Sequence, residues 1–262
     1  MNISTITEQY IKERLTKGIR DGGRGLMSYR DLTIEAGKLP NAEGSAEVNL
    51  GYTKVVAGVK IDVGEPMRDK PDEGSIMTGA ELLPLAHHSY DAGPPSAEAV
   101  ELARVTDRGI RAAGIIDLKK LFIEDGKSWN VFIDAYVLNY DGNLFDAATL
   151  AAVTALLTAR MPKYEDGKVI REGNLPKLET SNICTSCTFA KVAGTPVLDT
   201  DGSEEDFSDA RVTITNDERT IRAMQKGLGG SFTSRELDGF LDTTFQKSKD
   251  LRATIEKARK VD

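Results

Sequence analysis

The stretch SAEVNLGYTKVVAGVKIDV (45–63) alternates apolar and polar side chains and is rich in valine. A period of two residues and a high content of β-branched side chains are both typical of β-strands. Gly51 stands between the two alternating runs, where a glycine is typical of a turn. The stretch therefore predicts a β-hairpin that turns at Gly51.

More strands and two helices follow the hairpin. Strand-like runs occupy SIMTGAELLPLA (75–86) and WNVFIDAYVLNY (129–140). A helix is predicted over residues 93–114, because two prolines enter it and Ser96 can cap its first turn. A second helix is predicted over about 146–160, where leucines and a valine recur at core spacing. This order of strands and helices predicts an α+β fold.

The same plan recurs after a polar interruption. Residues 163–182 are polar and contain proline and glycine, which predicts a linker. CTFAKVAGTPVLD (187–199) and ARVTITNDERTIRAMQKG (210–227) predict two strand pairs, and Thr233 with Glu236 predicts a capping box that opens a long helix. The chain is therefore predicted to have four parts: an N-terminal helix and arm (1–30), a first α+β half (31–162), the linker (163–182) and a second α+β half with the long C-terminal helix (183–262).

The composition is that of a globular protein without a membrane-spanning helix. The chain has 262 residues, of which 40% are hydrophobic and 29% charged, as in a globular protein. Its longest nearly apolar run, LAAVTALLTA (150–159), is about half as long as the ~20 residues that cross a bilayer. We therefore expect a cytoplasmic protein without membrane contact. The net charge of −7 argues against coating of nucleic acid by charge alone, although a local basic groove remains compatible with it.

The only cysteines, Cys184 and Cys187, form a C-x-x-C pair. A zinc site would need two more ligands, and the only histidines, His87 and His88, are adjacent and far away in the sequence. A redox pair should stand at the start of a helix, whereas SCTFAKV reads as a strand. The favoured interpretation is two thiols on or beside a strand.

Three arginines share one face of the helix predicted at 93–114. In ELARVTDRGIR (101–111), Arg108 and Arg111 lie roughly 40° and 20° on either side of Arg104 at about 100° per residue. One interpretation is a solvated face with ion pairs to neighbouring acids. The other is a phosphate-binding face, since each guanidinium can donate two hydrogen bonds to one phosphate. One-turn spacing, about 5–6 Å, roughly matches the phosphates of an extended single strand.

Three blocks of the sequence together resemble the RNase PH-like proteins. They are GSAEVNLGYTKVVAGVKIDVGEP (44–66), GPPSAEAVELARVTDRGIR (93–111) and FIDAYVLNYDGNLFDAATLAAVTALL (132–157). The resemblance runs from about residue 18 to the end, and RDGGRG (20–25) carries one glycine more than the Asp-Gly-Arg of the family. Within this group the chain looks like the non-catalytic RNase PH-type subunit of the archaeal exosome.

The resemblance implies a duplicated RNase PH-like β-α fold, whose first half is like domain 2 of ribosomal protein S5. It also implies a hexameric ring of three heterodimers, in which this chain alternates with a catalytic RNase PH-like subunit. RNA-binding cap subunits and single-stranded RNA are the further partners expected, and the RNA is shortened from its 3′ end by inorganic phosphate. The resemblance assigns no cofactor to this chain, and places phosphate and Mg²⁺ at the partner's active site.

The resemblance also assigns roles to individual residues. Arginines of the non-catalytic subunit reach across the shared interface and hold RNA phosphates beside the partner's active site. Arg104 and Arg108 match these positions, and Arg111 lies on the same face. Active relatives carry aspartates in a motif E-D-x-x-G-x-A-D, and in EEDFSDARV (204–212) the final aspartate is replaced by Arg211. A guanidinium cannot bind a divalent cation.

Two local motifs leave alternatives open. Glu204, Glu205, Asp206 and Asp209 are either a metal site or, as we favour, a solvated acidic turn before a strand. KGLGGS (226–231) resembles a phosphate-binding glycine loop, but its lysine precedes the glycines, so a turn that joins two strands, or a strand and a helix, is favoured.

The leading hypothesis is therefore an RNA-binding subunit without an active site of its own. A self-sufficient phosphorolytic 3′ exoribonuclease is the first alternative, and Arg211 argues against it. An oligomeric scaffold without RNA contact is the second, in which the arginines only pair with acids across an interface.

Overall fold

The predicted hairpin forms the middle of a six-stranded sheet. In the computed structural model, which describes residues 3–20 and 23–260, β2 and β3 pair in register and turn at Gly51, whose φ is +58°. The strand order is β1-β2-β3-β6-β4, with β5 beside β6, and all pairs are antiparallel except β4–β6. The strands are β1 (Leu32–Ala36), β2 (Gly44–Leu50), β3 (Thr53–Gly64), β4 (Ser75–Leu82), β5 (Phe122–Glu124) and β6 (Lys127–Asn139).

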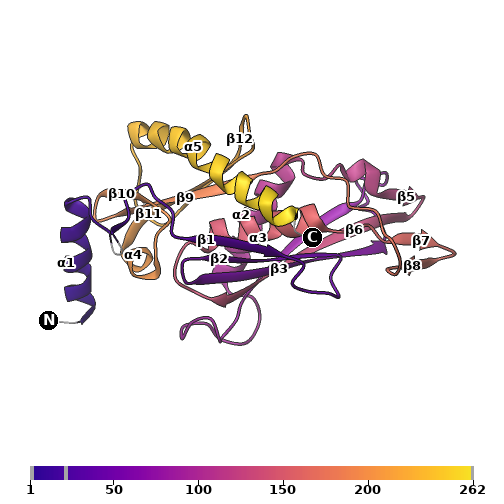
Figure 1. Cartoon of the computed structure of the whole chain (residues 1–262), viewed down its shortest axis with the longest axis horizontal. Helices are drawn as coiled ribbons and strands as arrows, with labels where there is room; N and C mark the ends of the chain where they lie inside the picture. Colours follow the sequence, from indigo (N-terminus) through magenta and orange to yellow (C-terminus); the bar gives the residue numbers. More distant parts are fainter. Residues whose placement is uncertain (1–2, 21–22, 261–262) are drawn as a thin grey trace.

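Helix α3 (Leu144–Thr158) is the centre of the molecule. Every one of its 15 residues is buried, since its sequence is small or apolar on nearly all sides. It packs on β2 and β3 on one side and on β9 (Thr185–Val192) of a second sheet on the other (Figure 1). At Gly44, an added Cβ would lie 2.2 Å from the carbonyl oxygen of Ala155, so only glycine allows β2 to approach α3 so closely.

The second sheet and the long helix α5 (Ser234–Arg259) close the other side of the core. Thr188 of the second sheet faces α3, because its Oγ1 donates to Asp146 of that helix at 2.8 Å. Phe189 faces the opposite way and stacks on Phe240 of α5, with ring centroids 4.4 Å apart. The strands, in the order β10-β9-β11-β12, are β9 (Thr185–Val192), β10 (Thr195–Leu198), β11 (Ser208–Asn216) and β12 (Ile221–Gly227).

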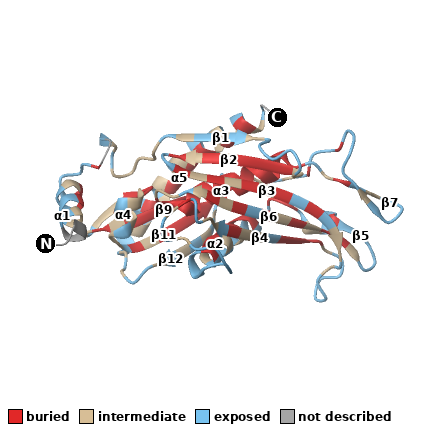
Figure 2. Cartoon of the chain, turned by 90° about the horizontal axis from the view of Figure 1, so that it is seen from below, coloured by how far each residue is buried: buried red, intermediate tan, exposed pale blue. Residues whose placement is uncertain are grey.

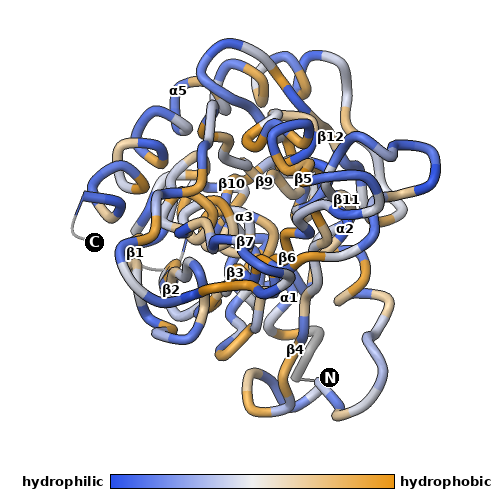
Figure 3. The backbone as a smooth tube through the Cα atoms, turned by 90° about the vertical axis from the view of Figure 1, so that its right-hand side faces the viewer, coloured by the Kyte–Doolittle hydropathy of each residue, from blue (hydrophilic) through white to orange (hydrophobic). Residues whose placement is uncertain are grey.

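Hydrophobic and buried segments follow this layering. Figure 3 shows orange, hydrophobic stretches gathered around α3, with blue segments at the periphery. In Figure 2 the buried stretches of β2 and β3 are red, whereas α1 (Ile3–Thr16) is mostly pale blue or tan. Across residues 3–20 and 23–260, no helix is long and apolar enough to span a bilayer.

Helix α1 lies at one end of the molecule, beside β10 (Figure 1). Its buried Ile11 and Leu15 pack on Ala190, Val192 and Val197 of the second sheet, as a small satellite core. The helix predicted near the N-terminus is therefore confirmed, and it begins at Ile3. Two residues of the RDGGRG motif, Asp21 and Gly22, lie outside the described residues.

The remaining segments contain short elements that the sequence did not predict. Within the predicted linker, β7 (Lys163–Glu165) and β8 (Lys168–Ile170) form a hairpin, and Leu175 and Leu178 are buried. The segment is therefore anchored to the core at its end. A short helix α4 (Gly202–Asp206) precedes β11, with a capping box from Asp201.

Candidate functional site

Helix α2 (Ala97–Ala113) carries the three arginines, and both its ends are fixed. Ser96 is the N-cap and accepts a hydrogen bond from the Ala99 N–H at 3.2 Å, as predicted. Gly114 closes the helix in the left-handed conformation, with φ of 63°. Gly109 packs against Thr215 of β11, where an added Cβ would lie 3.0 Å from the threonine methyl group. These contacts fix the rotation of the helix about its axis.

Arg104, Arg108 and Arg111 all point away from the core, as the spacing predicted. We call them the arginine face. On the opposite side Leu102 and Ile110 are buried. The arginines line one open groove of about 680 Å³ together with Met77 and Thr78 of β4. The face therefore combines positive charge with a surface depression wide enough for a ligand.

The three arginines differ in how far their charge is neutralised. Arg111 Nε donates to Asp107 Oδ2 at 2.6 Å, and its Nη2 donates to the carbonyl oxygen of Ile76. Arg108 Nη1 donates to the neutral amide oxygen of Gln225 on β12 at 2.5 Å. In the described part of the chain, no carboxylate lies within 4.0 Å of Arg104 or Arg108. These two guanidinium groups keep their full charge for an anion, whereas Arg111 is largely engaged.

Arg211 on β11 lies at the other end of α2 from Arg111, among acids and an aromatic ring. Its Nη2 donates to Glu101 Oε1 at 2.9 Å, and its Nη1 is 3.7 Å from Glu205 Oε1. The guanidinium lies over the Phe145 ring, with Cζ 4.2 Å from the centroid. A charged group thus occupies the space between the two carboxylates, so these residues do not fit a divalent cation.

The four acids of EEDFSDARV do not converge on one point. Glu204 is buried and pairs with Arg20 at 2.5 Å and with Arg24 at 3.2 Å. Glu205 Oε2 accepts from the Asn143 N–H at 2.7 Å, and burial raises the pKa of Glu205. Asp206 and Asp209 are exposed. Two of the four acids are therefore structural rather than solvated, which corrects the favoured interpretation of a solvated acidic turn.

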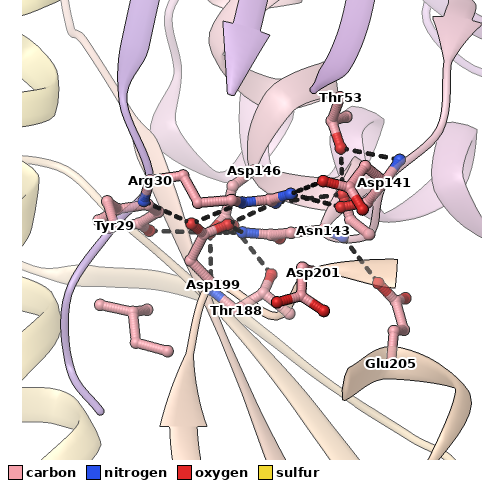
Figure 4. Close-up of polar contacts among 12 residues, drawn as sticks. Tyr29, Arg30, Thr53, Asp141, Asn143, Asp146, Thr188, Asp199, Asp201 and Glu205 are labelled. Carbon is pink, nitrogen blue, oxygen red and sulfur yellow. Dashed lines mark hydrogen bonds and ion pairs between the residues drawn. The ribbon is translucent and has the colours of Figure 1, made fainter. Parts of the chain in front are cut away.

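A buried polar network joins the N-terminal arm, α3 and the end of β10 (Figure 4). Asp199 has no exposed surface, and it accepts from Arg30 Nη2 at 2.8 Å, Arg24 Nη1 at 3.1 Å and Asn143 Nδ2 at 2.7 Å. Arg30 continues the network to Asp141. These residues were not predicted from the sequence, because they lie in loops and at element ends, where no periodicity marks them.

Asp146 at the start of α3 extends the network into the core. It accepts from Tyr29 Oη at 2.8 Å, Asn143 Nδ2 at 2.9 Å, and from the N–H and Oγ1 of Thr188 at 3.0 and 2.8 Å. Burial raises the pKa of Asp146 to about 6, against the lowering effect of these donors. The network therefore ties the two halves together at the end of α3 that faces Arg211.

The cysteines are buried and do not form a site. Cys184 directly precedes β9 and Cys187 lies within it, as the favoured interpretation predicted. Burial raises the pKa of the Cys184 thiol to about 12 and that of Cys187 above its ordinary value, which disfavours the reactive thiolate. Among the residues described, no three or more His, Cys, Asp or Glu side chains are grouped to hold a metal.

The glycine loop KGLGGS is a turn between β12 and α5. An added Cβ at Gly230 would lie 2.6 Å from the carbonyl oxygen of Asp209, and the Gly230 N–H donates to that oxygen at 2.8 Å. The N-terminus of α5 is closed by the predicted capping box of Thr233 and Glu236. The N–H groups of Thr233 and Glu236 are thus satisfied within the chain, which favours the turn.

Comparison with known proteins finds relatives along nearly the whole chain. Residues 28–162 match the 3′ exoribonuclease family, domain 1, and residues 182–247 match the 3′ exoribonuclease family, domain 2. The exosome complex component Rrp42 of Thermococcus gammatolerans is 44% identical over 256 residues, which cover 95% of this chain and 94% of the relative. The Rrp42 of Methanothermobacter thermautotrophicus is 42% identical over 261 residues, with 98% and 96% covered.

A solved structure is similar over the same length. It is described as the Archaeoglobus fulgidus exosome with RNA bound to the active site. One of its chains is 38% identical to this one, with a TM-score of 0.90, over 96% of this chain and 98% of that chain.

Proposed function

The chain belongs to the 3′ exoribonuclease family, and on this premise we propose that it is an exosome subunit without an active site of its own. In this role it pairs with a catalytic relative in a hexameric ring and binds RNA phosphates through the arginine face. The relatives named exosome component Rrp42, and the similar chain in an exosome with bound RNA, support membership of such a complex.

The proposal that this chain has no active site of its own is supported mainly by the position of Arg211. Active relatives are expected to have an aspartate there, and phosphoryl transfer through a metal ion needs carboxylates at that point. In this chain a guanidinium is held between Glu101 and Glu205 and stacked on Phe145. The same residues argue against a self-sufficient exoribonuclease. Phosphate and Mg²⁺ accordingly belong to the catalytic partner in this proposal.

The proposal that the arginine face binds RNA rests on the unneutralised charge of Arg104 and Arg108. They stand four residues apart, about 6 Å along the helix axis, which is close to the spacing of phosphates in an extended single strand. Phosphate contacts of this kind position RNA without reading its bases. Arg111 is a weaker ligand, because Asp107 and the Ile76 carbonyl already hold it. Cap subunits would be further partners, and a cytoplasmic location accords with this role.

Reversing the charge of the arginine face distinguishes RNA binding from the scaffold alternative. We expect Arg104→Glu with Arg108→Glu to leave ring assembly intact, to weaken RNA binding by about 10-fold or more, and to slow degradation by the assembled complex. A matched control with the same change of charge is Arg68→Glu with Arg235→Glu, two exposed arginines outside α2. Fluorescence anisotropy with a labelled oligoadenylate gives the affinity, and gel filtration gives the assembly. Unchanged degradation by an intact ring would favour the scaffold.

A further inference from the structure

A second basic cavity lies away from the arginine face, and nothing in the proposed function uses it. It has a volume of about 980 Å³ and is enclosed by residues 180–183, the β11–β12 turn and the C-terminal half of α5. Residues 181 and 182 anchor this wall to the end of α2, since Ser181 Oγ and Asn182 Nδ2 donate to the carbonyl oxygens of Gly114 and Ala113. In Figure 3 the turns of α5 toward the C-terminus carry long blue, hydrophilic stretches.

Cations outnumber anions in the lining of this cavity. Five of the lining side chains are basic and three are acidic, and two ion pairs join members of the two sets. Arg222 pairs with Asp217, and Arg259 Nη1 lies 3.5 Å from Glu256 Oε1. The basic residues are Arg219, Arg222, Lys249, Arg252 and Arg259, and the acidic residues are Asp217, Glu218 and Glu256. The cavity therefore has an excess of positive charge.

Three of these cations have no acidic partner. Within residues 3–20 and 23–260, no carboxylate lies within 4.0 Å of Arg219, Lys249 or Arg252. Asp217 fixes the turn that carries Arg219, because its Oδ1 accepts from the N–H groups of Arg219 and Thr220 at 2.8 and 2.7 Å. The Arg219 side chain is thus presented from a turn that is itself held in place.

Arg252 is the partly buried member of these three cations. Its Nη1 is buried from solvent, yet this atom has no hydrogen-bond partner in the protein. Buried donors are nearly always paired, and a charged donor without an acceptor is strongly disfavoured. Arg252 is one helical turn from Lys249 on α5 and lines the same cavity. The charge of Arg252 therefore has no acceptor in the described chain to balance it, and it adds to the positive excess of the cavity that this side chain lines.

We propose that this basic cavity binds a phosphate group, held chiefly by Arg219, Lys249 and Arg252. A phosphate oxyanion offers several acceptors to guanidinium and ammonium donors at once, which a carboxylate or a chloride ion does less well. The phosphate belongs either to a small phosphate compound or to the backbone of an RNA chain that extends beyond the arginine face. In both cases the chemistry recognised is the same.

The test is isothermal titration calorimetry of inorganic pyrophosphate into the full chain and two matched variants. Lys249→Gln removes a charge that lines the cavity, whereas Lys257→Gln removes the same charge from the same helix at an exposed position outside the lining. We expect Lys249→Gln to weaken pyrophosphate binding about fivefold to tenfold, and Lys257→Gln to change it less than about twofold. Arg252→Gln should weaken binding as well, while the melting temperature of each variant reports folding.

Two results would overturn the proposal. One is the absence of pyrophosphate binding to the unmodified chain at millimolar concentration. The other is an equal loss with Lys249→Gln and Lys257→Gln, which would indicate diffuse attraction to the helix.

A second arm identifies the source of the phosphate. If Lys249→Gln weakens binding of an oligoadenylate by a similar factor, the cavity lies on the path of RNA. If only pyrophosphate binding changes, the ligand is a small phosphate compound.

Discussion

Arg211 offers the most direct structural test, because its guanidinium has three defined contacts. It donates to Glu101 at 2.9 Å, lies 3.7 Å from Glu205 and covers the Phe145 ring at 4.2 Å. Arg211→Met keeps an unbranched apolar side chain over the ring and removes the charge and the donors. The substitution therefore isolates the electrostatic part of the interaction.

The expected loss of stability can be estimated from each contact. The pair with the partly exposed Glu101 is worth up to about 1 kcal/mol, and the cation–π contact about 0.5–1 kcal/mol. Leaving the partly buried Glu205 without a positive neighbour costs about 1–2 kcal/mol. Because neighbouring contacts do not add fully, we expect a total of about 3 kcal/mol. In a chain of 262 residues this lowers the melting temperature by roughly 6–10 °C.

The stability lost in Arg211→Met should also depend on pH. Burial raises the pKa of Glu205, while Arg211 acts to lower it. Without Arg211 the folded-state pKa of Glu205 rises further above its unfolded value, so the variant gains relative stability at low pH and loses it as pH rises. Arg211→Met should therefore be less destabilising at pH 5 than at pH 8.

Urea unfolding followed by circular dichroism at both pH values measures this effect. Arg235→Met, at an exposed position on α5, should change the free energy of unfolding by less than about 0.5 kcal/mol and serves as the control. The reasoning would be refuted if Arg211→Met lowered the free energy of unfolding by less than about 1 kcal/mol at pH 8, or by more at pH 5 than at pH 8.

Two further substitutions test the turn before α5 and the buried network. Gly230→Ala should destabilise the chain by about 1–3 kcal/mol in urea unfolding, because the new Cβ would lie 2.6 Å from the Asp209 carbonyl oxygen. Gly229→Ala, where an added Cβ meets nothing within 4 Å, is the matched control, and equal effects would contradict this view of the turn. Burial raises the pKa of Asp146 to about 6, so folding favours its protonated form. The stability of the unmodified chain relative to Asp146→Asn should fall by about 2 kcal/mol between pH 4 and pH 7; a constant difference would be evidence against the raised pKa.

Long periodic elements were predictable from sequence. The hairpin at 45–63, the caps at Ser96 and Thr233 and the helix of the arginine face all follow from local pattern and are confirmed. The duplicated fold that the resemblance implied is confirmed by the matches to both domains of one family. By contrast, β7, β8 and α4 have only three to five residues each, too few for a period to emerge.

The site was only partly predictable, because its contacts join distant segments. The spacing of Arg104, Arg108 and Arg111 predicted their common face. It did not reveal that Arg111 donates to the Ile76 carbonyl, 35 residues away. Likewise, the substitution of an arginine at 211 could be read from sequence, but its partner Glu101 lies 110 residues earlier in the chain. Such pairings depend on how strands and helices meet.

In the proposed function this chain binds and positions RNA but does not cleave it. The measurement is phosphate-dependent release of nucleoside diphosphates from a single-stranded RNA, with Mg²⁺ present. It compares this chain alone, its catalytic relative alone and the mixture of both. We predict no release by this chain alone, and faster release by the mixture than by the relative by itself. Release by this chain alone would contradict the account, since Arg211 would then lie in a working active site.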